Sequence, residues 1–261
     1  MIRIAEPGLS SELVGMLDKL QATIDALPDY AARVDAAKRG WESKPRERFE
    51  HIRETLRGMC AGEDRCMYCE DSSADEIEHV RPKSIYPDRT FRWTNYLLAC
   101  GPCNGPKNNR FAVLSKTQRR IVEVTRRRGA PPTAPDAGRM MLIDPRVEDP
   151  MRYLILDLVF PFHYRPRRER CSLAQARAAY TIELLRLNRD PLPRRREQAY
   201  RTYRLRLEEY VAEPDPEARK RHRAALLDLD HLTVWREMQR QHARIPELHR
   251  LFDQIPGAER W

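Results

Sequence analysis

Apolar residues recur at intervals of three and four near the start of the chain, the spacing that places side chains on one side of a helix. This predicts an amphipathic helix over residues 9–27, with Ser10 or Ser11 as its N-cap and Pro28 as its end. Residues 30–57 continue a helical pattern that Gly and Pro interrupt once. These helices carry no identifiable chemistry, so we expect them to pack against a core or a partner. The apolar positions of the first helix are Leu13, Met16, Leu17, Leu20, Ile24 and Leu27.

The pattern changes over residues 60–110, where short apolar runs alternate with Gly, Pro, Asn and Cys. Such runs bury little apolar surface by themselves, so they indicate a small unit that a metal stabilises. Residues 114–128 predict a helix. The segment that follows, 129–139, begins GAPPTAPDAG and has the composition of a linker.

The second half of the chain is predicted to be mainly helical. Residues 154–160 are dense in aliphatic and aromatic side chains, which is typical of a short hairpin or sheet. Beyond Ser172 we expect three helical stretches, separated by prolines near positions 191 and 214, of which the last spans 218–241.

Composition narrows the class of protein. A hydrophobic content of 41% is enough for at least one core. No apolar run approaches the ~18 residues of a membrane helix, and the N-terminal residues lack the charged-then-apolar order of a secretion signal. We therefore expect a globular, cytoplasmic protein that does not engage a membrane.

The formal net charge of +9 is concentrated in one stretch. Residues 165–206 contain 13 Arg and 4 acidic residues, and so account for the whole excess. A basic block of this kind suits a polyanion such as nucleic acid, because binding releases counterions from the phosphates. Arg is also the favoured basic residue throughout this chain, so a solvated helix face is an equal alternative.

Four of the six cysteines form two Cys-x-x-Cys pairs, CMYC and CGPC. Two such pairs supply the four thiolates of a tetrahedral Zn²⁺ site, and a site with four protein ligands is structural because no coordination position stays open. A redox dithiol would not explain two matched pairs. Cys60 and Cys171 lie outside this pattern and are expected to be small buried residues, with Cys60 a minor candidate for a substitute ligand. The predicted zinc ligands are Cys66, Cys69, Cys100 and Cys103.

A second group of polar residues lies inside and just beyond the loop that the cysteines close. Phosphodiester cleavage requires a base to activate water and a cation to stabilise charge on the phosphate. His79 suits the base, because its unperturbed pKa lies near neutrality. Glu78 and Asn104 offer hard oxygen ligands for Mg²⁺ or Mn²⁺, and Asn95 can brace the loop that carries His79. A zinc ribbon with a purely structural role needs none of these four residues.

The motifs IEHVRPKS, WTNYLLAC and CNGPKN, in this order between the cysteine pairs and after them, resemble the HNH or ββα-metal nuclease family in its four-cysteine form. The resemblance implies that His79 is the general base, that Glu78 and Asn104 hold the catalytic cation, and that Asn95 is the middle asparagine. Lys107 matches the lysine after the last cysteine pair. Arg81, Lys83 and Lys107 are candidate nucleic-acid contacts, with solvated side chains as the alternative. Trp93 is expected in the core.

A further resemblance extends to residues 142–150 and 181–189, with the phrases LIDPRVEDP and TIELLRLNR. These are similar to the HNH subunit of Septu-type and retron-associated antiphage systems. That resemblance implies a DNA-cleaving defence effector that works with an ABC/SMC-like ATPase partner. Two alternatives stay open: a non-catalytic zinc-ribbon adaptor that binds nucleic acid or protein, and a stand-alone restriction-type or RNA-cleaving nuclease.

Together these observations predict an α-dominated α+β chain with a small ββα-metal core. The predicted parts are an N-terminal helical region, 1–57; an HNH nuclease domain with the zinc site, 58–128; a linker, 129–139; and a mainly helical, Arg-rich C-terminal region, 140–261.

Overall fold

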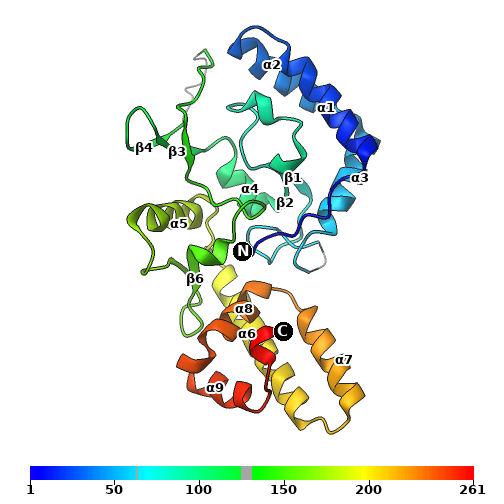
Figure 1. The fold of residues 1–261 in the computed structure, drawn as a ribbon, viewed down its shortest axis with the longest axis vertical. Coiled ribbons are helices and arrows are strands. Elements are labelled where there is room, and N and C mark those ends of the chain that lie inside the picture. The colour runs from blue at the N-terminus through cyan, green and yellow to red at the C-terminus, as the bar shows by residue number, and fades with distance from the viewer. Residues whose placement is uncertain (63, 125–130) are drawn as a thin grey trace.

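The computed structural model describes residues 1–62, 64–124 and 131–261. Its N-terminal helices are α1 (Ser11–Asp25), α2 (Tyr30–Glu42) and α3 (Arg46–Arg57), and they form an arc along one side of the small central sheet (Figure 1). The Ser10 hydroxyl caps α1 by accepting a hydrogen bond from the Leu13 N–H. The predicted helices of this region, and the break between the second and the third, are confirmed.

The centre of the molecule is a two-stranded hairpin followed by a short helix. Strand β1 (Glu76–His79) pairs antiparallel with β2 (Tyr96–Ala99), so that Glu78 faces Leu97 and His79 faces Tyr96. Helix α4 (Gly101–Lys107) follows β2 directly and packs on β1. This is the predicted ββα arrangement.

One predicted helix is wrong. Where residues 114–128 were expected to be helical, the chain instead forms β3 (Ala112–Ser115) and β4 (Ile121–Glu123), and the last residues of that prediction lie outside the described part. The two strands contain the β-branched residues Val113, Ile121 and Val122, which favour extended backbone, and the Ser115 hydroxyl accepts a hydrogen bond from the Gln118 N–H in the turn between them. Strand pairing across this turn replaces the helical hydrogen bonds.

The predicted linker is partly used as a strand. Strand β5 (Gly138–Met140) pairs with β3, so its first two residues fall inside the segment predicted to be a linker, whose first residues lie outside the described part. A Cβ atom on Gly138 would collide with the backbone of Leu114. Gly138 therefore allows a close approach of two strands rather than flexibility.

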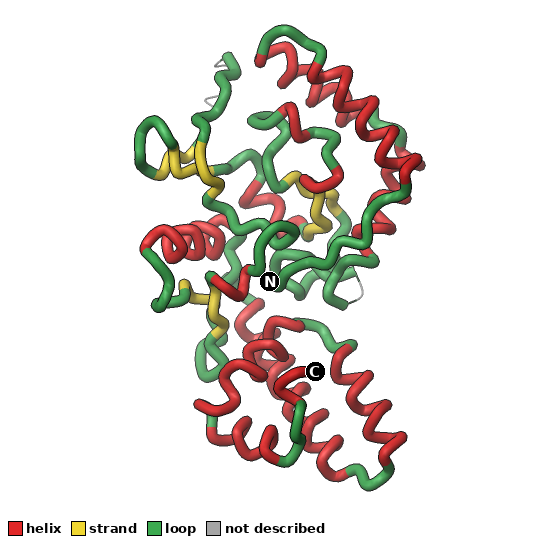
Figure 2. The backbone as a smooth tube through the Cα atoms, in the orientation of Figure 1, coloured by secondary structure: helices red, strands yellow, loops and turns green. Residues whose placement is uncertain are grey.

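The C-terminal half contains a small hairpin and a helical region, drawn in the lower part of Figure 2. The predicted hairpin is confirmed as β6 (Leu154–Leu156) and β7 (Tyr164–Pro166). The stretch predicted as one helix over 218–241 is divided, because His231 adopts a left-handed backbone conformation between two helices. The helices are α5 (Ser172–Leu184), α6 (Leu192–Ala212), α7 (Pro216–Leu227), α8 (Leu232–Gln241) and α9 (Pro246–Asp253).

A single large cluster of buried apolar side chains runs from the N-terminal helices, through the hairpin, to the C-terminal helices. Leu17, Leu97 and Trp235 are all fully buried in it. The α-dominated α+β class is confirmed. None of the helices in the described residues combines the length and apolar character that crossing a bilayer requires.

Candidate active site and metal centre

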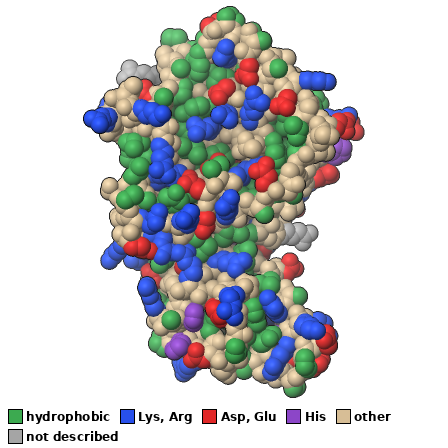
Figure 3. Space-filling model, in the orientation of Figure 1, with side chains coloured by type: hydrophobic (Ala, Val, Ile, Leu, Met, Phe, Trp, Pro, Cys, Tyr) green, Lys and Arg blue, Asp and Glu red, His purple; other side chains and the backbone are tan. Residues whose placement is uncertain are grey.

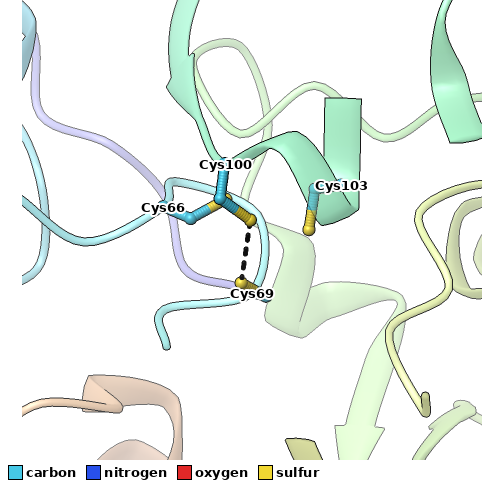
Figure 4. A group of neighbouring side chains, drawn as sticks. All are labelled: Cys66, Cys69, Cys100 and Cys103. Atoms are coloured by element: carbon cyan, nitrogen blue, oxygen red, sulfur yellow. Dashed lines mark hydrogen bonds between the residues drawn. The ribbon is translucent and has the colours of Figure 1, made fainter. Parts of the chain in front are cut away.

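Four cysteine side chains converge between the first loop of the core and helix α4. Their Sγ atoms all lie within 4.8 Å of one another, and all four residues are buried. Figure 4 shows them pointing toward a common centre. The Sγ atoms of Cys69 and Cys100 are 3.8 Å apart, which matches the edge of a tetrahedron with metal–sulfur bonds of about 2.3 Å. The predicted four-cysteine cluster is therefore present, with the geometry to hold one metal ion.

The other two cysteines do not join the cluster. Cys60 is half-buried against α3, and burial raises the pKa of its thiol to about 12. Its side chain is not among the four whose sulfur atoms cluster, so Cys60 is not placed as a substitute ligand. Cys171 is exposed at the start of α5, so the expectation that it would be buried is wrong.

His79 lies at the end of β1 and is 5% exposed. Its Nε2 atom is 3.0 Å from the carbonyl oxygen of Thr90. A carbonyl oxygen can only accept, so in the neutral ring Nε2 carries the hydrogen and Nδ1 has the free electron pair. Burial, with a further effect from Lys83, lowers the pKa of His79 to about 3. The imidazole is therefore a neutral base at physiological pH.

Two aromatic rings enclose the His79 imidazole. The centroid of the Trp41 ring, from α2, lies 4.3 Å from the centroid of the imidazole, and the centroid of the Tyr96 ring lies 5.2 Å from it. Both aromatic rings contact the imidazole in an edge-to-face arrangement. The Tyr96 hydroxyl also donates to the carbonyl of Thr90, the same oxygen that holds His79. The orientation of His79 is thus set by contacts on several sides.

Glu78, on the opposite side of β1, is 4% exposed and forms an ion pair with the fully buried Lys107. The Lys107 ammonium also donates to the main-chain oxygen of His79 over 2.8 Å. Burial raises the pKa of Glu78, and the positive charge of Lys107 acts against that shift. The three residues form one interior network between β1 and α4.

Asn95 secures the segment that follows β1. Its side-chain oxygen accepts from the Arg81 N–H, and its amide nitrogen donates to the carbonyl oxygens of Arg81 and Arg89. One buried side chain therefore satisfies three main-chain groups. These bonds connect the two ends of the loop between His79 and Thr90.

Asn104 lies on α4 and faces β1, where its amide nitrogen donates to the carboxylate of Glu76. Glu78 and Asn104 thus come from facing elements, and in the described structure each bonds to a different partner. A carboxylate and an amide oxygen are ligands that suit a hard divalent cation. The donor set fits a magnesium-type ion in its chemistry.

The three candidate nucleic-acid contacts occupy different settings. Lys107 is interior, as described above. Lys83 is partly buried with its ammonium 5.6 Å from the Trp41 ring, and burial lowers its pKa. The Arg81 guanidinium lies over the ring of Tyr86. Lys83 thus lies beside the same Trp41 ring that contacts His79.

The arginine-rich stretch 165–206 serves several purposes. Arg177 and Arg196 are buried and donate to main-chain oxygens. Arg201 and Arg206 pair with neighbouring glutamates of α6. Two of these arginines are therefore used inside the fold and two are paired on its surface. Figure 3 shows Lys and Arg side chains gathered across the middle of one face.

Two residues that touch the site are not among those predicted from the sequence. Trp41 covers His79 from a helix with no motif, and Arg189 approaches the cysteine cluster from the turn between α5 and α6. The sequence indicated Trp41 only as a tryptophan among polar neighbours in a helical segment. For Arg189, an arginine within an Arg-rich stretch, it offered no indication. Trp93 is buried as expected.

Comparison with known proteins agrees with this geometry. Residues 66–110 match the family described as HNH endonuclease. The chain is also similar to the Septu protein PtuB of Bacillus thuringiensis, with 41% identity over 49 residues; the matched stretch covers 17% of this chain and 19% of PtuB. The match spans less than a fifth of that relative's length. The cysteine cluster and the ββα arrangement lie within the matched residues, so the predicted resemblance to the HNH endonuclease family is confirmed over residues 66–110.

Proposed function

We propose that this protein is a metal-dependent endonuclease that hydrolyses DNA phosphodiester bonds. The observation that carries the proposal is the setting of His79. Its Nε2 hydrogen is directed to the Thr90 carbonyl, and within the described residues no hydrogen bond occupies Nδ1. A neutral imidazole with one fixed and one available nitrogen is the arrangement that a general base requires.

The chain's own residues divide the chemistry as follows. Nδ1 of His79 takes a proton from water as the water oxygen bonds to phosphorus, and the Thr90 carbonyl stabilises the imidazolium that results. The bond from phosphorus to the leaving sugar oxygen breaks, and that oxygen takes a proton from solvent. Asn95 keeps the loop in place while this charge develops. Glu78 and Asn104 would hold Mg²⁺ or Mn²⁺, which supplies charge stabilisation at the scissile phosphate. Glu78 is paired with Lys107 through one of its two carboxylate oxygens.

Cleavage of supercoiled plasmid tests the proposal directly. The purified chain, alone or with a co-purified partner, is expected to nick DNA with Mg²⁺ or Mn²⁺ and to be silent without them. His79→Ala should abolish nicking, whereas His249→Ala, which alters an exposed histidine on α9, should not. Full cleavage by His79→Ala would refute the mechanism. Parallel assays on linear DNA, modified DNA and RNA identify the substrate class.

We assign the four-cysteine cluster to structural Zn²⁺. Four buried sulfur ligands at tetrahedral spacing favour zinc, and they leave no position for substrate. If the protein were only a zinc-ribbon adaptor, joint replacement of Glu78, His79 and Asn104 would leave its function intact, whereas Cys66→Ser would not. Loss of function in the joint variant supports the nuclease.

We further propose a role in antiphage defence with an ATPase partner. The support is the likeness to Septu protein PtuB over the matched stretch and the resemblance of residues 142–150 and 181–189 to the same class of system. The test is protection of cells against phage by the chain with its neighbouring genes. Co-purification of an ATPase encoded beside it should accompany protection, and His79→Ala should remove protection while leaving co-purification unchanged.

A further inference from the structure

Arg189 reaches the cysteine cluster from outside the HNH domain. It lies in the turn between α5 and α6, and its guanidinium donates to two sulfur atoms: Nη1 is 3.5 Å from Sγ of Cys103 and Nη2 is 3.9 Å from Sγ of Cys100. The same Nη1 is 3.2 Å from the carbonyl oxygens of Leu185 and Arg186, which anchor the group to the turn. Of the arginines in the described residues, Arg189 is the one whose hydrogen bonds end on these sulfurs.

The charge of a zinc–cysteine centre explains why a cation belongs there. Four thiolates around one divalent ion carry a net charge of −2, and here all four cysteines are buried. A buried charge without a partner is costly, and an arginine that donates to it lowers that cost. The planar guanidinium can also donate to two sulfurs at once, which an ammonium cannot do with the same geometry.

The turn between α7 and α8, also in the C-terminal region, bonds to residues that flank the first cysteine pair. Asp230 forms an ion pair with Arg65 over 2.6 Å, and His231 bonds to Asp71 over 3.2 Å. These two contacts lie on either side of Cys66 and Cys69 in the sequence. The C-terminal helices thus hold the loop that carries one cysteine pair, while Arg189 contacts the other pair.

We propose that Arg189 is a positioning residue of the zinc centre: its guanidinium donates to the Cys100 and Cys103 thiolates, neutralises part of their charge and slows the loss of zinc. Zinc loss begins with attack on a thiolate by a proton or an electrophile, and N–H···S bonds make the sulfur less available to either. The proposal rests on the assignment of the cluster to zinc and is independent of nuclease activity. It makes the C-terminal region a part of the metal centre.

Zinc release from the full-length protein tests the proposal. Zinc content is first measured by mass spectrometry of the metal, and release into excess 4-(2-pyridylazo)resorcinol is then followed by absorbance. Arg189→Met removes the charge and keeps a side chain of similar length, and it should release zinc about tenfold faster, the lower end of the effect of residues that orient metal ligands. Arg189→Lys retains the charge without the planar guanidinium, and its rate of zinc release should lie between those of Arg189→Met and wild type. Arg194→Met, which alters an exposed arginine at the start of α6, should match wild type.

The outcomes separate the possible roles of Arg189. A merely structural role in the turn would make the Met and Lys variants equally fast, and that result overturns the proposal. Equal release by Arg189→Met and Arg194→Met overturns it as well. Cysteine alkylation by iodoacetamide provides a second readout: Cys100 and Cys103 should react faster than Cys66 and Cys69 in the Met variant. A wild-type protein without zinc would overturn both the zinc assignment and this proposal, whereas unchanged release from a zinc-containing protein overturns this proposal alone.

Discussion

The ammonium of Lys107 lies between the carboxylate of Glu78 and the main-chain oxygen of His79. The buried Lys107 ammonium thereby links the side chain of Glu78, the predicted metal ligand, to the main chain of His79, the predicted base. Lys107 is fully buried, so in this arrangement its charge serves the interior of the domain and not the surface that DNA would meet.

Replacing Lys107 by Met should destabilise the protein strongly. The substitution leaves the buried Glu78 carboxylate without its cation, and breaking a buried pair from one side costs about 3 kcal/mol or more. The free energy of unfolding in urea measures this loss. The double variant Glu78→Gln with Lys107→Met removes the unpaired charge and should recover much of the stability. If the single variant were as stable as wild type, the pair would have no structural role.

The stability of the protein should depend on pH through His79. Its pKa is lowered to about 3 in the folded state, whereas an unfolded histidine has a pKa of about 6.5. Between these values the unfolded chain binds more protons, so stability falls as the pH decreases below about 6.5. Between pH 7 and pH 5 the protonation of this residue in the unfolded chain should lower the free energy of unfolding by about 2 kcal/mol.

Comparison with His79→Gln isolates that contribution, because Gln does not titrate and every other group is shared. The free energy of unfolding of wild type should decrease between pH 7 and pH 5 by more than that of the variant. Parallel decreases in the two proteins would show that His79 is not held neutral by burial. Protonation of His79 should likewise cause no loss of cleavage rate as the pH falls through 6.5, because its pKa in the folded protein is about 3.

Trp41 should control the environment of His79. Its ring contacts the imidazole at 4.3 Å and is half-buried, so Trp41→Leu opens the site to water. We expect the pKa of His79 to rise toward its ordinary value, because less desolvation favours the charged form. The free energy of unfolding should fall by about 2 kcal/mol, less than for a fully buried aromatic residue. NMR titration of the imidazole measures the first effect.

Trp41→Phe is the matched control, since it retains an aromatic ring over His79 and should shift the pKa less. An unchanged His79 pKa in Trp41→Leu would show that Trp41 does not shield the imidazole. A change in stability without a change in pKa would assign Trp41 to packing alone, including its contacts with Phe49 and Phe91.

The two proposed metals should have separable effects. Stripping zinc with a high-affinity chelator is expected to unfold the core, because its small sheet and α4 depend on the cysteine cluster. Omitting Mg²⁺ should stop cleavage and leave the fold intact, since Glu78 already has a protein partner in Lys107. Circular dichroism and plasmid nicking measure the two effects in one preparation. An unchanged spectrum after verified zinc removal would contradict the structural assignment of the cluster.

Local sequence patterns were sufficient for most helices and for the metal cluster. The spacing of Leu13, Leu17 and Ile24 predicted α1, and two matched Cys-x-x-Cys pairs predicted four clustered sulfurs. Both features depend on residues close together in the chain, or on a chemistry with few alternatives. The predicted helix at 114–128 failed because β3 pairs with β4 across a turn within this segment and with β5, which lies beyond it.

What the sequence determined by itself was therefore the type of chemistry: which side chains can bind zinc, which can act as a base, and which segments are helical. Only the tertiary structure decided which residues contact these side chains. Glu78 meets Lys107, His79 lies beneath Trp41, and Cys103 receives a hydrogen bond from Arg189, which is 86 residues away. Each of these contacts joins elements that the local sequence predicts without reference to the contact. Periodicity specifies which face of an element is buried, and packing alone specifies what that face meets.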